Sequence, residues 1–193
     1  MNLPNAISLG RILIVPLSIW LILLDAMMPA FWLVVAAAIS DGIDGLIAKK
    51  FDSVTVLGGF LDPIADKVLL ISIFITLGVD QYIPSWLVIL VVFRDLLLIG
   101  GAMLYHTITQ ALTMEPMVVS KINTASQLIF IILILGELAF SLSINALKEI
   151  GIIIVALTTF ISGFLYVWKW GYRASEIEVK SKINTSNCFE DHK

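Results

Sequence analysis

Long apolar segments dominate this chain, and they constrain its fold more than any other feature. Of the 193 residues, 59% are hydrophobic and 14% are charged, whereas soluble domains carry about 25% charged residues. A helix of about 20 apolar residues crosses a hydrocarbon core of about 30 Å. Segments of this length, bounded by proline, glycine or charge, run over residues 7–25, 29–49, 57–78, 84–105, 120–140 and 147–169. We therefore predict an all-α integral membrane protein, built as a six-transmembrane-helix bundle.

The end of the chain has a different composition. After Trp170 the sequence is polar and charged and has little to bury, which predicts a short helical exit and then a disordered end. The predicted division is thus a transmembrane domain over 1–170 and a tail over 171–193. The first apolar segment lacks the small-residue cleavage pattern of a secretory signal, so we expect it to be retained.

Basic residues indicate the orientation, because they gather on the cytoplasmic side of membrane proteins. They follow the second, fourth and sixth apolar segments, at Lys49, Lys50, Lys121, Lys169, Arg173, Lys180, Lys182 and Lys193. Only Lys148 falls on the other side. We predict cytoplasmic termini in a membrane protein of the bacterial inner membrane. The net charge of −3, with no clustered basic face, argues against a nucleic-acid partner.

Four aspartates interrupt the second and third apolar segments: Asp41, Asp44, Asp62 and Asp66. Each central aspartate costs about 2.5–3.5 kcal/mol on insertion, so four cost about 10–14 kcal/mol. Helical residues three and four apart share a face, so each pair lies on one side of its helix. The short link between the segments lets the two faces converge in the cytoplasmic half of the membrane.

Four carboxylates together require countercharge, and oxygen ligands suit hard cations. Two divalent cations, Mg²⁺ or Mn²⁺, would balance four negative charges. Zinc is disfavoured because His106 and His192 are far apart in the sequence and the single Cys188 adds no second thiolate. Metal-binding carboxylates, with glycines that allow close approach and with basic residues nearby, describe a diphosphate site.

Other interpretations of the aspartates remain open. A carboxylate within a span can be half of a structural ion pair, with Lys67 or Arg94 as partner, and cation transporters also use intramembrane carboxylates. Intramembrane prenyltransferases bind diphosphates through aspartates too, but their two acidic motifs typically occupy well-separated helix pairs, whereas both motifs here fall within residues 41–66. Single glycines are more often packing residues than substrate contacts.

The spacing of these residues resembles a family signature. The run Asp41-x2-Asp44-Gly45-x2-Ala48-Lys49, followed by eight residues and Gly58-x3-Asp62-x3-Asp66, is similar to the motif of the CDP-alcohol phosphatidyltransferases. Lys49 stands where the family has arginine, which keeps the charge but not the two-pronged phosphate contact. The resemblance implies transfer of a phosphatidyl group from CDP-diacylglycerol to a hydroxyl acceptor, with release of CMP, in a six-helix bundle of that type.

Three further segments resemble particular branches of the family. The segment from Pro4 to Arg11 looks like the amino terminus of phosphatidylglycerophosphate and cardiolipin synthases, and the segments from Arg94 to Gly101 and from Ser120 to Gln127 look like mitochondrial-type cardiolipin synthases. Phosphatidylglycerophosphate synthases usually carry a second basic residue where Asn123 stands. An acceptor with a phosphate monoester needs more positive charge than phosphatidylglycerol does. This favours phosphatidylglycerol over glycerol 3-phosphate as acceptor.

The resemblance also implies roles for individual residues. Asp41, Asp44 and Asp62 would bind two divalent cations, and Asp66 would be both a metal ligand and the catalytic base. Positions matching CDP-lipid contacts are Asn5, Ser8, Gly45, Lys49 and Thr55. Arg94 and Lys121 would line the acceptor pocket, and the family suggests a homodimer within membrane lipid. A cation transporter, or a member of the fold that has lost activity, is the alternative.

Overall fold

Six helices make up the described parts of the computed structural model, which cover residues 3–51, 56–109 and 118–190. Side chains are described for residues 10, 13–40, 67–101 and 119–168. The helices are α1 (Leu3–Leu23), α2 (Met27–Phe51), α3 (Val56–Val79), α4 (Ser85–Thr109), α5 (Val118–Phe140) and α6 (Asn145–Glu190). Each corresponds to one apolar segment, so the all-α prediction is confirmed.

Two helical segments among the described side chains are clearly apolar over a length that matches a bilayer. Val119–Phe140 and Asn145–Trp168 are long and apolar enough to cross a bilayer by length and composition. Shorter apolar stretches run over Leu13–Leu23, Met27–Ser40 and Lys67–Val79. A bundle of six spans therefore stays a prediction.

The core lies where α3 and α5 meet their neighbours. α1 packs against α2 and α3, α5 against α2 and α6, and α4 against α6 and α3. Phe74 of α3 is fully buried and stacks on Phe130 of α5, with the ring centroids 6.2 Å apart. The outside is apolar as well, with more than half of the surface of Ile153, Phe160 and Trp168 exposed. An apolar exterior of this extent is unusual for a soluble monomer and suits contact with lipid.

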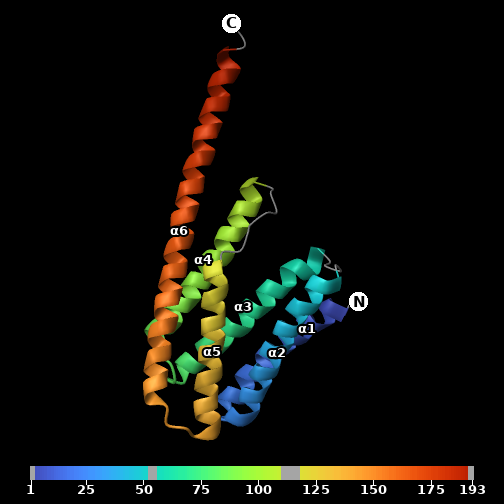
Figure 1. Cartoon of the computed structure of the whole chain (residues 1–193), viewed down its shortest axis with the longest axis vertical. Helices are drawn as coiled ribbons and strands as arrows, with labels where there is room; N and C mark the ends of the chain where they lie inside the picture. The colour runs from blue at the N-terminus through green and yellow to red at the C-terminus, as the bar shows by residue number, and fades with distance from the viewer. Residues whose placement is uncertain (1–2, 52–55, 110–117, 191–193) are drawn as a thin grey trace.

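The helices alternate in direction, which sorts their ends into two groups (Figure 1). The start of α1 lies toward the same end of the molecule as the end of α2 and the start of α3. The end of α4, the start of α5 and the end of α6 lie toward that end too (Figure 1). Residues 27–51 and 56–79 thus bring both halves of the aspartate motif to one end of the bundle.

At the opposite end of the bundle, a hydrogen bond connects the loop that follows α1 to the loop that follows α3. The Tyr82 hydroxyl donates a hydrogen bond of 3.4 Å to Asp25 Oδ1. Burial, and then the negative charges of Asp25 and Asp80, raise the pKa of Tyr82, so its phenol stays protonated and able to donate at neutral pH. Asp25 has a φ of 55°, a left-handed conformation that aspartate tolerates better than most residues.

α6 continues well beyond the other helices and ends at Glu190 (Figure 1). The sequence predicts a short helical exit and then a disordered end, whereas the backbone of 171–190 is helical. Sequence spacing accounts for a polar helix here, because Glu176 and Lys180, like Glu178 and Lys182, stand four residues apart in the favourable order. The domain boundary at residue 170 remains a prediction.

Close packing of α5 and α6 predicts the effect of one substitution. A Cβ atom on Gly151 would lie 2.6 Å from the Phe130 ring, which is 2% exposed and cannot move without disturbing Phe74. We expect Gly151→Ala to lower the free energy of unfolding by about 1–3 kcal/mol, measured by thermal unfolding in detergent. Gly100→Ala is the matched control, because nothing lies within 4 Å of a Cβ there; a Gly151 variant as stable as this control would contradict the packing argument.

Candidate active site

The four motif aspartates lie on two consecutive helices. Asp41 and Asp44 belong to the second half of α2, and Asp62 and Asp66 to the first half of α3. Because both segments are helical, the spacings of three and four residues put each pair on one helix face. The side chains of 41–66 are outside the described set, so the convergence of the four carboxylates stays a prediction.

The positions predicted to bind the CDP-lipid are described by backbone alone. Asn5 and Ser8 lie in α1, Gly45 and Lys49 lie in α2, and Thr55 falls outside the described residues. α1 packs against both α2 and α3, and its start lies toward the end of the bundle that carries the motif (Figure 1). The fold thus brings the amino-terminal segment to the same end as the aspartates.

The two residues predicted to bind the acceptor lie in different environments. Lys121 is exposed in the first turns of α5. Arg94 of α4 is 3% exposed and bonded to protein groups on three sides. Its guanidinium is therefore held inside the protein before any substrate binds, and its predicted role in acceptor binding remains a prediction.

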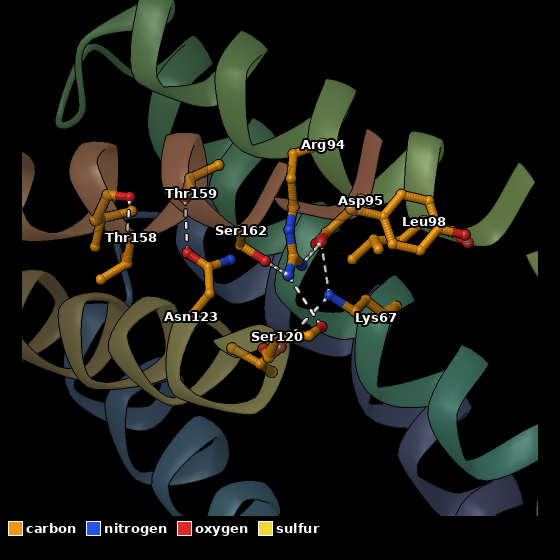
Figure 2. A network of polar contacts seen from close by, with 12 residues as sticks. Lys67, Arg94, Asp95, Leu98, Ser120, Asn123, Thr158, Thr159 and Ser162 are labelled. Carbon is orange, nitrogen blue, oxygen red and sulfur yellow. Dashed lines mark hydrogen bonds and ion pairs between the residues drawn. The ribbon is translucent and has the colours of Figure 1, made fainter. Parts of the chain in front are cut away.

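Arg94 belongs to a group of polar side chains that links four helices, the Asp95 cluster, shown in Figure 2. Its members are Lys67, Arg94, Asp95, Ser120, Thr124 and Ser162. Asp95 Oδ1 accepts from Lys67 Nζ at 2.6 Å and from Arg94 Nη1 at 2.5 Å. Arg94 Nη2 donates to the hydroxyls of Ser162 at 2.5 Å and of Ser120 at 3.0 Å. Lys67 Nζ also lies 3.5 Å from Thr124 Oγ1.

Burial makes the Asp95 cluster electrostatically strong. The Asp95 side chain is completely buried, and the side chains of Arg94 and Lys67 are 3% and 16% exposed. Charges in a medium of low dielectric constant interact far more strongly than in water, so the two cations and the shared carboxylate hold α3 and α4 together. Within the described set, Asp95 Oδ2 and Arg94 Nε are buried without a hydrogen-bonding partner.

A second polar contact continues along the seam between α5 and α6. The Thr159 hydroxyl donates to Asn123 Oδ1 at 2.9 Å, and both residues are buried. Asn123 Nδ2 and both polar atoms of the Gln127 amide are buried with no partner among the described side chains. Asn123 is the position that the sequence analysis linked to the acceptor, and it carries no charge.

Sequence reasoning gave no role to Asp95, Ser120 or Ser162. One signal was present, because an ionisable residue within an apolar span is by default a candidate for function and Asp95 stands directly after Arg94 in such a span. The serines gave no such signal. Their connection to Arg94 depends on the packing of α4 against α6 and of α5 against α6.

The donor chemistry of the motif fits a hard divalent cation. Among the side chains that the structure describes, no three His, Cys, Asp or Glu residues form a group able to hold a metal ion. The motif aspartates lie outside those side chains. Four carboxylates and no paired histidine or thiolate are the ligand set of Mg²⁺ or Mn²⁺ rather than zinc.

Comparison with known proteins identifies the family. A family model described as CDP-alcohol phosphatidyltransferase matches residues 1–167. These residues hold the aspartate motif and all the helices up to the middle of α6, an all-helical arrangement with clearly apolar segments. The chain belongs to the CDP-alcohol phosphatidyltransferase family, a family of membrane proteins that generally depend on divalent cations.

Similar proteins fall into two groups by name. A chloroplastic CDP-diacylglycerol–glycerol-3-phosphate 3-phosphatidyltransferase of Oryza sativa is 35% identical over 148 residues, covering 68% of this chain and 45% of that protein. The Bacillus subtilis CDP-diacylglycerol–glycerol-3-phosphate 3-phosphatidyltransferase is 29% identical, and the match covers 87% of this chain and 94% of that protein. The cardiolipin synthase (CMP-forming) of Rattus norvegicus is 30% identical, with 94% of this chain and 65% of that protein covered.

Length differs among these relatives. The chain spans 45%, 30% and 47% of the relatives from Oryza sativa, Schizosaccharomyces pombe and Drosophila melanogaster.

Proposed function

We propose that this protein transfers a phosphatidyl group from CDP-diacylglycerol to phosphatidylglycerol, releasing CMP and forming cardiolipin. The observation that carries the proposal is the four-aspartate motif, which keeps the family spacing across the consecutive helices α2 and α3. The match of the family model over 1–167 and the names of the relatives support it. Phosphatidylglycerophosphate synthesis from glycerol 3-phosphate is the second candidate. Relatives named CDP-diacylglycerol–glycerol-3-phosphate 3-phosphatidyltransferase are as similar to this chain as the relatives named cardiolipin synthase.

The proposal includes an arrangement in the membrane. The six helices cross the bacterial inner membrane, and both termini and the active site face the cytoplasm. Basic residues that follow the second, fourth and sixth apolar segments of the sequence support this orientation. A nucleotide leaving group can then stay in water while the acyl chains stay in lipid. The apolar exposed faces of α4 and α6 are compatible with a homodimer.

The chain's own residues have distinct roles in the proposed reaction. Asp41, Asp44, Asp62 and Asp66 would hold two divalent cations, which would bind the diphosphate and stabilise charge on the leaving oxygen. Asp66 also accepts the proton of the acceptor hydroxyl. That hydroxyl oxygen forms a bond to the lipid-side phosphorus, and the bond from this phosphorus to the bridging oxygen breaks. CMP leaves with the electron pair of that bond.

Binding roles complete the proposal. Contacts to the CDP-lipid come from Asn5, Ser8, Gly45, Lys49 and Thr55. Lys121, exposed near the start of α5, and Arg94 contact the acceptor. An inactive member of the fold or a cation transporter would release no CMP, so metal-dependent release of CMP from CDP-diacylglycerol separates these alternatives from the enzyme.

An acceptor assay tests the choice between the two products. Detergent-solubilised protein receives CDP-diacylglycerol with phosphatidylglycerol or with glycerol 3-phosphate, and the lipid products are identified by mass spectrometry. We expect a preference for phosphatidylglycerol of about tenfold or more in kcat/KM, because the buried amide of Asn123 offers no charge to a phosphate monoester. A preference for glycerol 3-phosphate would overturn the acceptor but not the class of reaction.

A further inference from the structure

The Asp95 cluster adjoins the proposed catalytic base in the sequence. Lys67, which donates to Asp95 at 2.6 Å, directly follows Asp66 in α3, and consecutive Cα atoms are about 3.8 Å apart. Asp62 stands one helical turn before Asp66. A contact that holds Lys67 in place therefore also constrains the turn of α3 that carries Asp62 and Asp66.

Asp95 contacts one basic residue of α3 and one of α4. On one side its Oδ1 holds Lys67 of α3. On the other the same oxygen accepts from Arg94, whose second terminal nitrogen holds Ser120 of α5 and Ser162 of α6. Figure 2 shows these side chains converging from four helices on one point. A single carboxylate thus connects α3 to a frame formed by α4, α5 and α6.

Stability alone is a poor explanation for such a group. Removing charges from water costs several kcal/mol for each ion, and apolar replacements of buried ion pairs are often neutral or stabilising. The cluster also joins two cations to one carboxylate, which a simple structural pair would not need.

We propose that Asp95 is a positioning residue for the acidic motif: anchored by Arg94, it fixes Lys67 and with it the turn of α3 that carries Asp62 and Asp66. This inference rests on the proposed function. The Asp95 side chain is completely buried, so it acts through Lys67, by holding two carboxylates of the site at the separation that the diphosphate and its cations require. Misplacement by about 1 Å can cost about 100-fold in rate.

The test compares single and double variants of the full chain in detergent. We expect Lys67→Met and Asp95→Asn each to lower kcat for CMP release by about 10- to 100-fold, with the KM for CDP-diacylglycerol within about threefold of the parent. Because both changes break the same link, the double variant should lose no more than the worse single variant. Losses that multiply would overturn the proposal.

Binding of the cation gives a readout apart from turnover. Mn²⁺ should raise the thermal unfolding temperature of the parent protein, and this rise should shrink in Lys67→Met, whose Arg94–Asp95 pair remains neutral and buried. An undiminished rise together with kcat within about twofold of the parent would refute the positioning role. If the parent itself releases no CMP, the proposed function fails, whereas the Mn²⁺ response still tests the positioning of the aspartates.

Two further variants guard against a folding defect. Asp95→Glu keeps the charge for both cations but lengthens the side chain, so it should fold and still lower kcat; full turnover in this variant would contradict the proposal. Thr76→Val is the matched control on α3, because the Thr76 hydroxyl donates to the Ser72 carbonyl of its own helix at 2.8 Å and, among the described residues, forms no link to another helix. We expect kcat of the control to stay within about twofold of the parent.

Discussion

Asp66→Asn is expected to abolish CMP release from CDP-diacylglycerol. Asparagine keeps the shape of the side chain but cannot accept the proton of the acceptor hydroxyl, and it is a weaker ligand for a divalent cation. Loss of a general base alone costs about 10²- to 10⁴-fold, and loss of a metal ligand adds to it. The measurement is CMP released per minute in Mn²⁺ or Mg²⁺, with phosphatidylglycerol present at saturation.

The matched control for this variant stands at the other end of the same helix. Asp80 directly follows the last residue of α3 (Val56–Val79), whereas Asp62 and Asp66 stand in the first half of that helix. Asp80→Asn makes the same chemical change and should leave CMP release within about twofold of the parent. Full turnover by Asp66→Asn would remove Asp66 from the role of catalytic base, and equal losses in both variants would show that the effect is not specific to the motif.

Arg94→Met is expected to cause the largest loss of stability. The change leaves the hydroxyls of Ser120 and Ser162 without their buried donor and leaves Asp95 with Lys67 as its remaining charged partner in the cluster. Removing one partner of a buried ion pair typically costs about 3–5 kcal/mol. Because Lys67 still neutralises Asp95, we expect about 2–4 kcal/mol here, measured by unfolding in detergent.

Two companion variants make this result specific. Arg94→Lys retains the charge but lacks the planar fork that reaches both serines and Asp95, so it should recover only part of the lost stability. Lys148→Met removes a basic residue outside the cluster, near the start of α6, and should change the free energy of unfolding by less than about 0.5 kcal/mol. An Arg94→Met protein as stable as the Lys148 variant would contradict the importance of the cluster.

The local sequence determined most of the helical structure. Each apolar segment forms one helix, and apart from the end of α6 the helix ends lie within a few residues of the prediction, as in 57–78 against Val56–Val79. Burial of apolar side chains and satisfaction of backbone hydrogen bonds both favour helix there. The structure differs from the prediction at the end of α6, because the helix continues to Glu190. Low hydrophobicity argued for disorder in that segment, while the favourably spaced charges of the sequence are those of a polar helix.

The sequence by itself determined the motif, because spacings of three and four residues assign four aspartates to two helix faces whatever the packing. It also determined the family, through the same spacing. Only the tertiary structure decided that Arg94 and Asp95 join Lys67, Ser120 and Ser162 from three other helices. Contacts between residues 26 to 68 positions apart depend on how whole helices pack, and helical periodicity carries no information about that.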